Sequence, residues 1–256
     1  MSVRLGRFMK CRDVLPTTKF AYWKRLGTCD ALLCVAHILQ SAFEMVHEAR
    51  IVQIDFSAAY DRVNHHGVLY NLCSVGVGGS VLSVLTQFLS NRSQYVVVDG
   101  CCSKLVNVVS GVPQRSVLGL KLFVLYTADL FSIVENNRYG YADDSTLVAV
   151  VPSPGERVVV SESMNRDLNR VSVWCNLWGM KLNASKTKTM IDSRSRTVHP
   201  QITPMTLDLT VLKESADRVI LGVTFAAKMT FETPSLGFQS CSSEAWYHEK
   251  VLAGIS

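Results

Sequence analysis

Two adjacent carboxylates, Asp143 and Asp144, stand at the bend between two apolar segments that are both strand-like. Adjacent carboxylates repel each other, and a hairpin bend usually contains Asn-Gly or Asp-Gly instead. A solvated acidic turn would explain the pair if it stood alone. A third carboxylate, Asp55, directly follows the β-branched segment Ile51–Ile54, which is predicted to be a buried strand. We therefore expect the three carboxylates to converge where neighbouring strands end.

A cluster of three carboxylates favours a particular chemistry. Like charges raise each other's pKa, and divalent cations relieve that repulsion. Magnesium binds carboxylate oxygens and keeps positions open for phosphate. Two such ions roughly 4 Å apart can stabilise both the attacking and the leaving oxygen of a phosphoryl transfer. The carboxylates therefore predict nucleotidyl transfer or phosphodiester hydrolysis with two Mg²⁺ ions, for which Mn²⁺ is an alternative.

The elements that would position these carboxylates follow from hydrophobic periodicity and turn signals. The sequence predicts amphipathic helices within 1–50, a strand at 51–54, helices at 64–72 and 80–89 (with Ser80 as N-cap), hairpin strands at 94–98 and 104–109, a helix near 116–132, strands at 138–142 and 146–151, a long helix around 164–178, and strands at 206–212 and 218–225. This order indicates an α+β fold in which an antiparallel sheet packs on helices. The two tryptophans of the long helix, Trp174 and Trp178, are predicted to be core residues.

Composition places limits on the class of protein. The chain has 256 residues, of which 48% are hydrophobic and 18% charged, so it can bury a core and is not a disordered chain. The net charge of +5 permits a polyanionic partner without indicating one. The eight cysteines include no Cys-x-x-Cys pair and the six histidines have no metal-ligand spacing, which is typical of reduced thiols. We expect an intracellular protein, nuclear or cytoplasmic, that is not secreted and has no membrane span.

Five short motifs follow one another along the chain. They are Asp55-Phe-Ser-Ala-Ala-Tyr-Asp-Arg-Val63, Ser110-Gly-Val-Pro-Gln-Arg-Ser-Val-Leu-Gly119, Tyr141-Ala-Asp-Asp144, Trp178-Gly-Met-Lys-Leu-Asn-Ala-Ser-Lys-Thr-Lys188 and Leu221-Gly-Val223. With its motifs in this order, the chain resembles the reverse transcriptases of non-LTR retrotransposons, jockey-like elements in particular. The resemblance covers roughly residues 1 to 230. The five motifs correspond to motifs A, B, C and D and to the primer-grip hairpin. The resemblance implies a polymerase palm with partial fingers and a missing thumb.

The resemblance also implies roles for the acidic residues and for the nucleotide site. Asp55 and Asp143 would hold both magnesium ions, with Asp144 assisting. Residues after Asp55 would approach the triphosphate of the incoming dNTP, and Tyr60 would place its ring where a ribose 2′-hydroxyl would clash. From the sequence alone, Tyr60 could equally be a core aromatic residue. The dNTP-binding residues implied in this way are Phe56, Ala58, Ala59, Tyr60, Pro113 and Gln114.

The remaining implied roles concern the pyrophosphate and the nucleic acid. Lys186 would lie near the leaving pyrophosphate, where a lysine can donate a proton or neutralise charge. It could also be a solvated lysine, or one of a basic run that holds phosphates without sequence preference. Leu221 and Gly222 would belong to the primer grip. The implied partners are an RNA template, a DNA primer and dNTP.

Several positions depart from the family's pattern. Arg115 stands where motif B has glycine, and its side chain could obstruct template or dNTP. Lys121 places a charge in an apolar helix start, which costs about a few kcal/mol if the charge is buried. Asp192 interrupts an apolar strand end. The tail from about 233 does not resemble the family, and we hypothesise a frameshift upstream of Ser243.

These features predict four regions and leave three functions open. The regions are partial fingers at 1–50, a palm core with motifs A to D at 51–192, the end of the palm with a primer-grip-like hairpin at 193–232, and an aberrant tail at 233–256. The leading hypothesis is an RNA-directed DNA polymerase, although Arg115 and truncation predict weak activity for this copy. The alternatives are a catalytically dead remnant that binds nucleic acid, and a metal-dependent nuclease that uses the same carboxylates.

Overall fold

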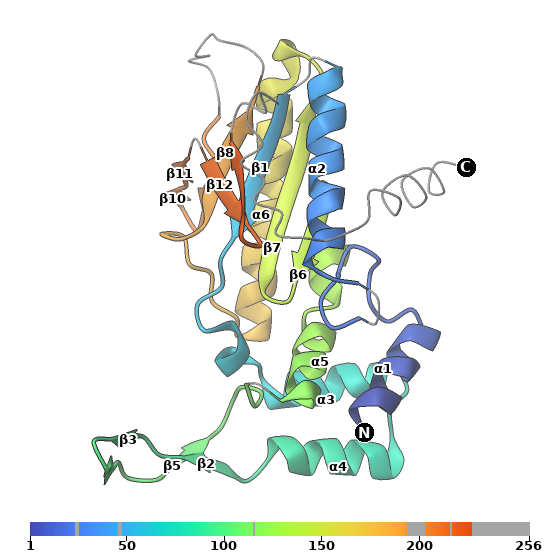
Figure 1. Cartoon of the computed structure of the whole chain (residues 1–256), viewed down its shortest axis with the longest axis vertical. Helices are drawn as coiled ribbons and strands as arrows, with labels where there is room; N and C mark the ends of the chain where they lie inside the picture. The colour runs from blue at the N-terminus through green and yellow to red at the C-terminus, as the bar shows by residue number, and fades with distance from the viewer. Residues whose placement is uncertain (24–25, 46–47, 115, 194–202, 216, 227–256) are drawn as a thin grey trace.

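A computed structural model describes residues 1–23, 26–45, 48–114, 116–193, 203–215 and 217–226 (Figure 1). Its elements in chain order are α1 (Ser2–Cys11), α2 (Thr28–Glu44), β1 (Glu48–Ile54), η1 (Ala59–Arg62), α3 (His65–Ser74), α4 (Gly79–Leu89), β2 (Arg92–Gln94), β3 (Val97–Val98), β4 (Cys101–Cys102), β5 (Val106–Val108), α5 (Val117–Tyr126), η2 (Asp129–Ser132), β6 (Asn137–Tyr141), β7 (Asp144–Val151), η3 (Pro154–Glu156), α6 (Arg157–Trp178), β8 (Lys188–Asp192), β9 (Thr206–Leu207), β10 (Thr210–Val211), β11 (Lys213–Glu214), β12 (Asp217–Ile220) and β13 (Val223–Ala226). The proposed frameshifted tail and Arg115 lie outside the described residues.

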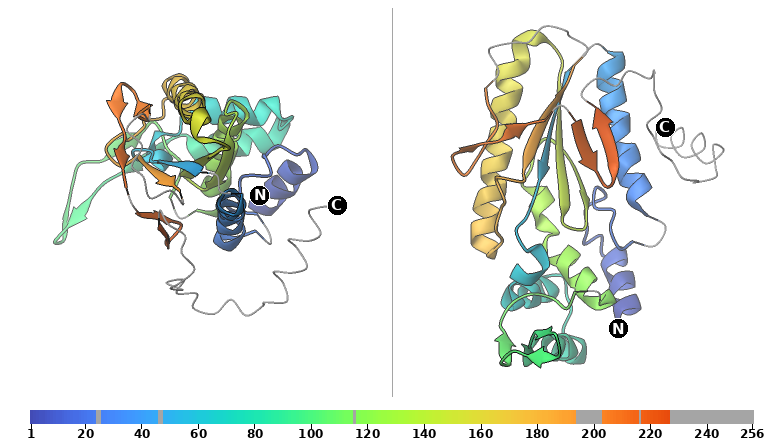
Figure 2. Two further views of the ribbon diagram at one scale, coloured as in Figure 1. Left: turned by 90° about the horizontal axis from the view of Figure 1, so that it is seen from above. Right: turned by 60° about the vertical axis from the view of Figure 1, so that its left-hand side comes forward.

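A five-stranded sheet forms the centre of the molecule, with strand order β11-β8-β1-β7-β6. All neighbours are antiparallel except β11 and β8. Helix α2 covers one face of the sheet and α6 the other (Figure 2). The central strand β1 is therefore buried on both sides, and its neighbouring residues Ile51 and Val52 are both fully buried, against α2 and α6 respectively. Burial on both faces explains why the adjacent residues Ile51 and Val52 are both apolar rather than alternating with polar ones.

Helix α6 packs by one apolar stripe, as its periodicity predicts. Met164, Leu168 and Val171 are buried on the sheet. Trp174 and Trp178 stack with ring centroids 6.0 Å apart, and Tyr126 of α5 meets Trp178 edge-on at 5.3 Å. The Tyr126 hydroxyl also donates to the backbone carbonyl of Trp178. Trp174 is thus a core residue, as expected, and Trp178 is partly buried against the same core, so that the two rings join α6 to α5.

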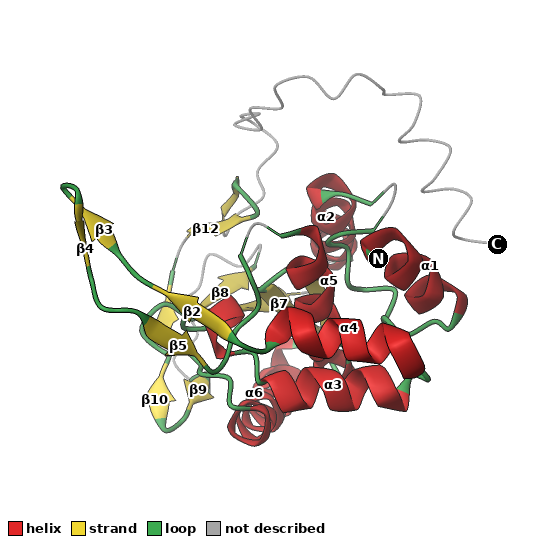
Figure 3. Ribbon diagram, turned by 90° about the horizontal axis from the view of Figure 1, so that it is seen from below, coloured by secondary structure: helices red, strands yellow, loops and turns green. Residues whose placement is uncertain are grey.

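Helices α3, α4 and α5 pack together beyond one end of the sheet, and a long hairpin extends from them (Figure 3). Asn64 caps α3 through its side-chain oxygen, which accepts from the Gly67 N–H at 3.0 Å. The hairpin turns at Asp99-Gly100 with φ values of 49° and 79°, as predicted. The predicted Ser80 cap is wrong, because α4 begins after Gly78 without a side-chain cap.

Three other element predictions differ from the structure. The segments 206–212 and 218–225 are each strand-like by residue pattern, but each contains a short hairpin, β9–β10 and β12–β13. The second hairpin is the one that the resemblance implies at Leu221-Gly222. Both turn through residues with positive φ: 48° and 63° at Asp208-Leu209, and 50° and 83° at Leu221-Gly222. Leucine rarely adopts this conformation, so composition did not indicate these turns. The helix expected at 116–132 ends at Tyr126 and continues as η2.

The two charged residues that depart from the family's pattern, Lys121 and Asp192, lie in different environments. Lys121 is not an unpaired buried charge, because it is partly exposed and its Nζ donates to the Ser2 carbonyl at 2.6 Å. Asp192 is 4% exposed, its Oδ1 has no hydrogen-bond partner, and burial raises its pKa to about 7. None of the seven described cysteines forms a disulfide bond. Within the part of the chain that the structure describes, no helix is both long and apolar enough to span a bilayer.

The segment before α2 is anchored to the sheet beside β6. The N–H of Phe20 donates to the Gly140 carbonyl, and the N–H of Gly140 donates to the Thr18 carbonyl, both at 2.9 Å. Between these bonds, the buried Lys19 amine donates to the backbone and hydroxyl oxygens of Thr127. Burial lowers the pKa of Lys19 to about 7, and the nearby Asp129 opposes this shift only partly.

Lys19 should make the stability of the fold depend on pH. Its pKa is about 7 in the folded state but near 10.5 when exposed, so the unfolded state holds more protons between these values. The free energy of unfolding contributed by this residue therefore rises with pH above 7, by at most about 1.4 kcal/mol per pH unit. We expect Lys19→Met to lack this rise when urea unfolding is measured at pH 8 and pH 9. An equal rise in the free energy of unfolding between pH 8 and pH 9 in the unchanged chain and in Lys19→Met would contradict this role of Lys19.

Candidate active site

The sheet register brings the three predicted carboxylates to one end of the sheet. Ile54 of β1 pairs with Ser145 of β7, so the next residues in this register are Asp55 and Asp144. Tyr141 of β6 also pairs with Asp144, which leaves Ala142 and Asp143 as a two-residue turn. This turn requires φ of +58° at Ala142. Asp55 is therefore a close neighbour of both turn carboxylates, at the end of the sheet that faces α5 (Figure 1).

The three carboxylates interact electrostatically. Burial raises the pKa of Asp143, and the charge of Asp55 raises it further. The pKa of Asp144 is raised by desolvation, then by Asp143 and Asp55, although its side chain remains exposed at the surface. No salt bridge among the described residues offsets this negative charge. The end of the sheet thus gathers negative charge that only an added cation would neutralise.

The donor set suits a hard divalent cation such as Mg²⁺. Every potential ligand here is a carboxylate oxygen, and Mg²⁺ binds through one or two carboxylates while keeping waters or phosphates. Within the described ranges, however, no three His, Cys, Asp or Glu side chains are already gathered closely enough to hold a metal ion. The residues therefore fit a magnesium site in their chemistry and in their placement on the sheet, without forming a preassembled cage.

Motif D fixes the backbone around Asp55. The N–H of Asp55 donates to the Thr187 hydroxyl at 3.1 Å, and its carbonyl accepts from the Asn183 N–H at 2.9 Å. Phe56 forms an antiparallel bridge with Leu182, and the Ser57 N–H donates to the Lys181 carbonyl at 2.8 Å. The loop between α6 and β8 therefore extends the sheet beside the carboxylate.

Lys186 lies on this motif D loop, one residue before Thr187. Its side chain is exposed, and in the described structure it makes no ion pair with the three carboxylates. Leu221 and Gly222 form the turn of β12–β13, where Leu221 packs with the apolar cluster beneath α2. No described bond joins the side chain of Lys186, or the Leu221-Gly222 turn, to the three carboxylate groups.

The residues after Asp55 form a tight turn. Ala58 has φ of +50° and is exposed, whereas Ala59 begins η1 and is buried. The ring of Tyr60 lies 4.3 Å from that of Phe123 in α5 and is tilted by 33°. Tyr60 therefore packs on the core, as one of its two interpretations predicted. Its hydroxyl nevertheless lies near the carboxylates, because Asp143 and Asp144 both contribute to raising its pKa after burial and Tyr22.

Motif B is attached to the same turn by its backbone. The N–H of Val112 donates to the Tyr60 carbonyl at 2.9 Å, and that of Gly111 to the Val63 carbonyl at 2.8 Å. Gly111 has φ of +86°, and a Cβ there would lie 2.8 Å from the Asp61 Cα. Next to it, partly buried Pro113 leads to Gln114, whose Nε2 donates to Asp61 Oδ1 at 2.9 Å. The structure thus joins motifs A and B directly.

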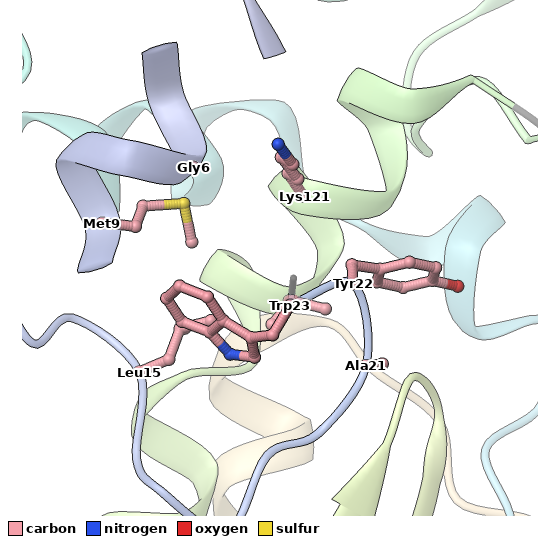
Figure 4. Close-up of a pocket in the computed structure, with 8 residues that line it drawn as sticks. Gly6, Met9, Leu15, Ala21, Tyr22, Trp23 and Lys121 are labelled. Carbon is pink, nitrogen blue, oxygen red and sulfur yellow. The ribbon is translucent and has the colours of Figure 1, made fainter. Parts of the chain in front are cut away.

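Sequence analysis did not single out Tyr22, which lies at the same site. Its hydroxyl is 3.0 Å from that of Tyr60. The pKa of Tyr22 is raised by burial and, to a smaller extent, by the charge of Asp143, which places it near the acidic turn. Its ring points away from Trp23 and Leu15 (Figure 4). No motif marked this residue, because its placement depends on the pairing of residues 18–20 with β6.

The sequence of this chain is similar to known proteins. The model of a family described as "Reverse transcriptase (RNA-dependent DNA polymerase)" matches residues 10–225. The chain is 26% identical over 238 residues to the RNA-directed DNA polymerase from mobile element jockey of Drosophila melanogaster, which covers 89% of this chain and 25% of that protein. It is 28% identical to a probable RNA-directed DNA polymerase from transposon BS of the same species, over 89% of this chain and 26% of that one. The chain therefore spans about a quarter of the length of these curated relatives.

Solved structures share the fold at low sequence identity. Apo telomerase from Candida tropicalis matches 88% of this chain and 39% of its own, with a TM-score of 0.56 and 11% identity. Telomerase from Candida albicans, in complex with a fragment of telomeric RNA, matches 85% of this chain and 36% of its own, with a TM-score of 0.55 and 14% identity. The predicted α+β fold, a partial palm and fingers, is thereby confirmed.

The junction between motifs A and B leads to a stability prediction at Gly111. Gly111→Ala should destabilise the fold by about 2 kcal/mol or more, because it adds left-handed backbone strain to a clash with the Asp61 backbone. Gly179→Ala is the matched control: its φ is +70° but nothing lies within 4 Å of its added Cβ, so about 1 kcal/mol is expected. Urea unfolding compares the two variants. Equal losses would show that motif B does not depend on this close approach.

Proposed function

The chain belongs to the reverse transcriptase (RNA-dependent DNA polymerase) family, and we propose that it carries the centre for RNA-directed DNA synthesis of a jockey-like mobile element. The observation that carries the proposal is the sheet register that sets Asp55 beside the Asp143-Asp144 turn. The raised pKa of Asp143 and of Asp144, caused first by burial and then by neighbouring carboxylates, supports it, since such a cluster favours binding of dications.

In the proposed reaction, the 3′-hydroxyl of a primer attacks the α-phosphate of a dNTP, and pyrophosphate leaves. Asp55 and Asp143 would hold two Mg²⁺ ions with Asp144 assisting, and the bound ions would stabilise the attacking and leaving oxygens. The half-buried setting strengthens these electrostatic interactions, because fewer waters screen them. The Asp55 backbone donates to the Thr187 hydroxyl and accepts from the Asn183 N–H, and these two bonds hold Asp55 in position while charge changes at the reacting phosphate.

The incoming nucleotide would bind over the turn that follows Asp55. We propose that the exposed backbone at Ala58, between Phe56 and Ala59, approaches the triphosphate. Tyr60 would exclude a ribose 2′-hydroxyl, and its packing on Phe123 supports this role because it fixes the ring. Pro113 and Gln114 would support the nascent base pair from the motif B loop, which the Gln114–Asp61 hydrogen bond holds to motif A.

The nucleic acid would be held mainly through its backbone, since a polymerase must accept every sequence. We propose an RNA template and a DNA primer as partners, a proposal that the RNA-bound telomerase neighbour supports. Lys186, exposed on the motif D loop, would neutralise the leaving pyrophosphate. Leu221 and Gly222, at the β12–β13 turn, would contact the primer. The palm would comprise residues 51–192 and the fingers part of residues 1–50.

Primer extension tests the proposal. The full chain is incubated with an RNA template, a DNA primer, dNTPs and Mg²⁺, and we expect extension that stops when EDTA removes the metal. Asp143→Asn should reduce extension to background, because it removes a proposed metal ligand. Asp99→Asn, at the hairpin tip away from the site, is the matched control and should extend as the unchanged chain does.

Each other outcome identifies a different function. RNA binding without extension in the unchanged chain would identify a catalytically dead remnant. Cleavage of nucleic acid without dNTP, lost in Asp143→Asn, would identify a nuclease. If extension occurs and survives Asp143→Asn, the assignment of the carboxylates is wrong.

A further inference from the structure

Tyr22 stands beside the proposed catalytic centre in a conformation that needs an explanation. Its φ is +64°, in the left-handed region that side chains rarely adopt. Such a conformation persists only where surrounding contacts impose it, and it is frequent at functional sites. The contacts that impose it include the hydrogen bonds of Thr18 and Phe20 to Gly140, which anchor the segment before Tyr22 along β6.

The strand that carries the acidic turn also determines where Tyr22 lies. Residues 18–20 are hydrogen-bonded to Gly140, one residue before Tyr141. A Cβ at Gly140 would lie 2.6 Å from the Phe131 ring, so the close packing at this point requires glycine. Ala21 is only 2% exposed. The chain is therefore fixed up to the residue before Tyr22, which emerges next to the acidic turn.

Tyr22 and Phe123 together hold Tyr60 at two points. The Phe123 ring contacts the Tyr60 ring at 4.3 Å, and the Tyr22 hydroxyl meets the Tyr60 hydroxyl at 3.0 Å. The first contact fixes the plane of the ring and the second fixes its far end. A Tyr60 ring that tilted away from Phe123 would break the hydroxyl contact with Tyr22. Tyr22 is among the residues that line the pocket shown in Figure 4, and its ring extends from there away from Leu15 and Trp23.

We propose that Tyr22 is a positioning residue that sets discrimination between deoxyribonucleotides and ribonucleotides through its hydrogen bond to Tyr60. The inference rests on the proposed function, because it requires a nucleotide sugar to lie against Tyr60. A ribose needs additional space for its 2′-hydroxyl. A Tyr60 ring held at both points occupies the space that the 2′-hydroxyl needs. A ring released from Tyr22 can tilt and leave that space open.

The test is a double-mutant cycle on the full chain. Tyr22→Phe and Tyr60→Phe each keep the ring and remove one side of the same hydrogen bond. The ratio of kcat/KM for a dNTP to that for the rNTP with the same base is measured by primer extension. We expect each variant to lower the ratio about fivefold, the effect typical of one net hydrogen bond. The double variant should show no further loss, because the bond is already absent.

Tyr70→Phe is the matched control, since Tyr70 lies exposed on α3 outside the proposed site. It should leave the ratio unchanged. A purely structural role for Tyr22 predicts a lower melting temperature with an unchanged ratio, and that result would overturn the inference. The inference would also be overturned if the losses in the ratio from the two single variants added in the double variant. If Tyr22→Phe does not fold, Tyr60→Phe removes the same bond from the other side. An unchanged dNTP-to-rNTP ratio in Tyr60→Phe would also overturn the inference.

The experiment also separates this inference from the proposed function. Equilibrium binding of the same dNTP and rNTP to the protein with primer and template, in Ca²⁺, is measured beside extension. If the unchanged chain neither extends nor binds dNTP, the proposed function fails and the inference fails with it. If the unchanged chain discriminates and Tyr22→Phe discriminates equally, only the inference fails.

Discussion

Repulsion among three carboxylates is the constraint around which the rest of this structure is arranged. Asp55, Asp143 and Asp144 would separate if they stood on mobile loops. The sheet prevents this, because Asp55 continues a strand that is buried on both faces, and the turn is closed by pairing of Tyr141 with Asp144. The apolar burial of the central strand therefore supplies the free energy that holds like charges together.

The segments around the carboxylates are held by backbone bonds and close approaches. Motif D bonds to the backbone of Asp55, motif B to Tyr60 and Val63, and the segment before α2 to Gly140. Backbone contacts suit this task, because they fix position without adding a charge near the reacting phosphates. They also explain the glycines: Gly111 and Gly140 stand where a Cβ would meet another chain segment at under 3 Å. Three segments that are distant in sequence are thus bonded to the same end of the sheet.

Sequence reasoning predicted the parts of this fold that depend on periodicity and failed where conformation depends on partners. The helix around Leu168 and the strand at Ile51 follow from apolar spacing, and the order of motifs identified the family. Residue patterns did not indicate the two hairpins that turn at Leu209 and Leu221, because both leucines adopt positive φ, which their side chains disfavour. Only the resemblance to the family implied the second of them. Tyr22 was missed for a related reason. It is placed by a bridge between Lys19 and Gly140, more than a hundred residues apart, and no local pattern encodes such a pairing.

The two ends of the central strand show that the acidic end is not arranged for stability. Glu48 begins β1 and is buried, yet Arg157 contacts it through two nitrogens and Ser193 donates to it at 3.1 Å. Although burial alone would raise the pKa of Glu48, these hydrogen bonds lower it below its usual value. Asp55 follows the other end of the same strand, where the neighbouring charges are Asp143 and Asp144, and the pKa of both is raised. The carboxylate at one end of β1 is thus paired with a cationic side chain, whereas the carboxylate that follows the other end is not. Such an unpaired negative charge persists where it contributes to binding a cationic ligand.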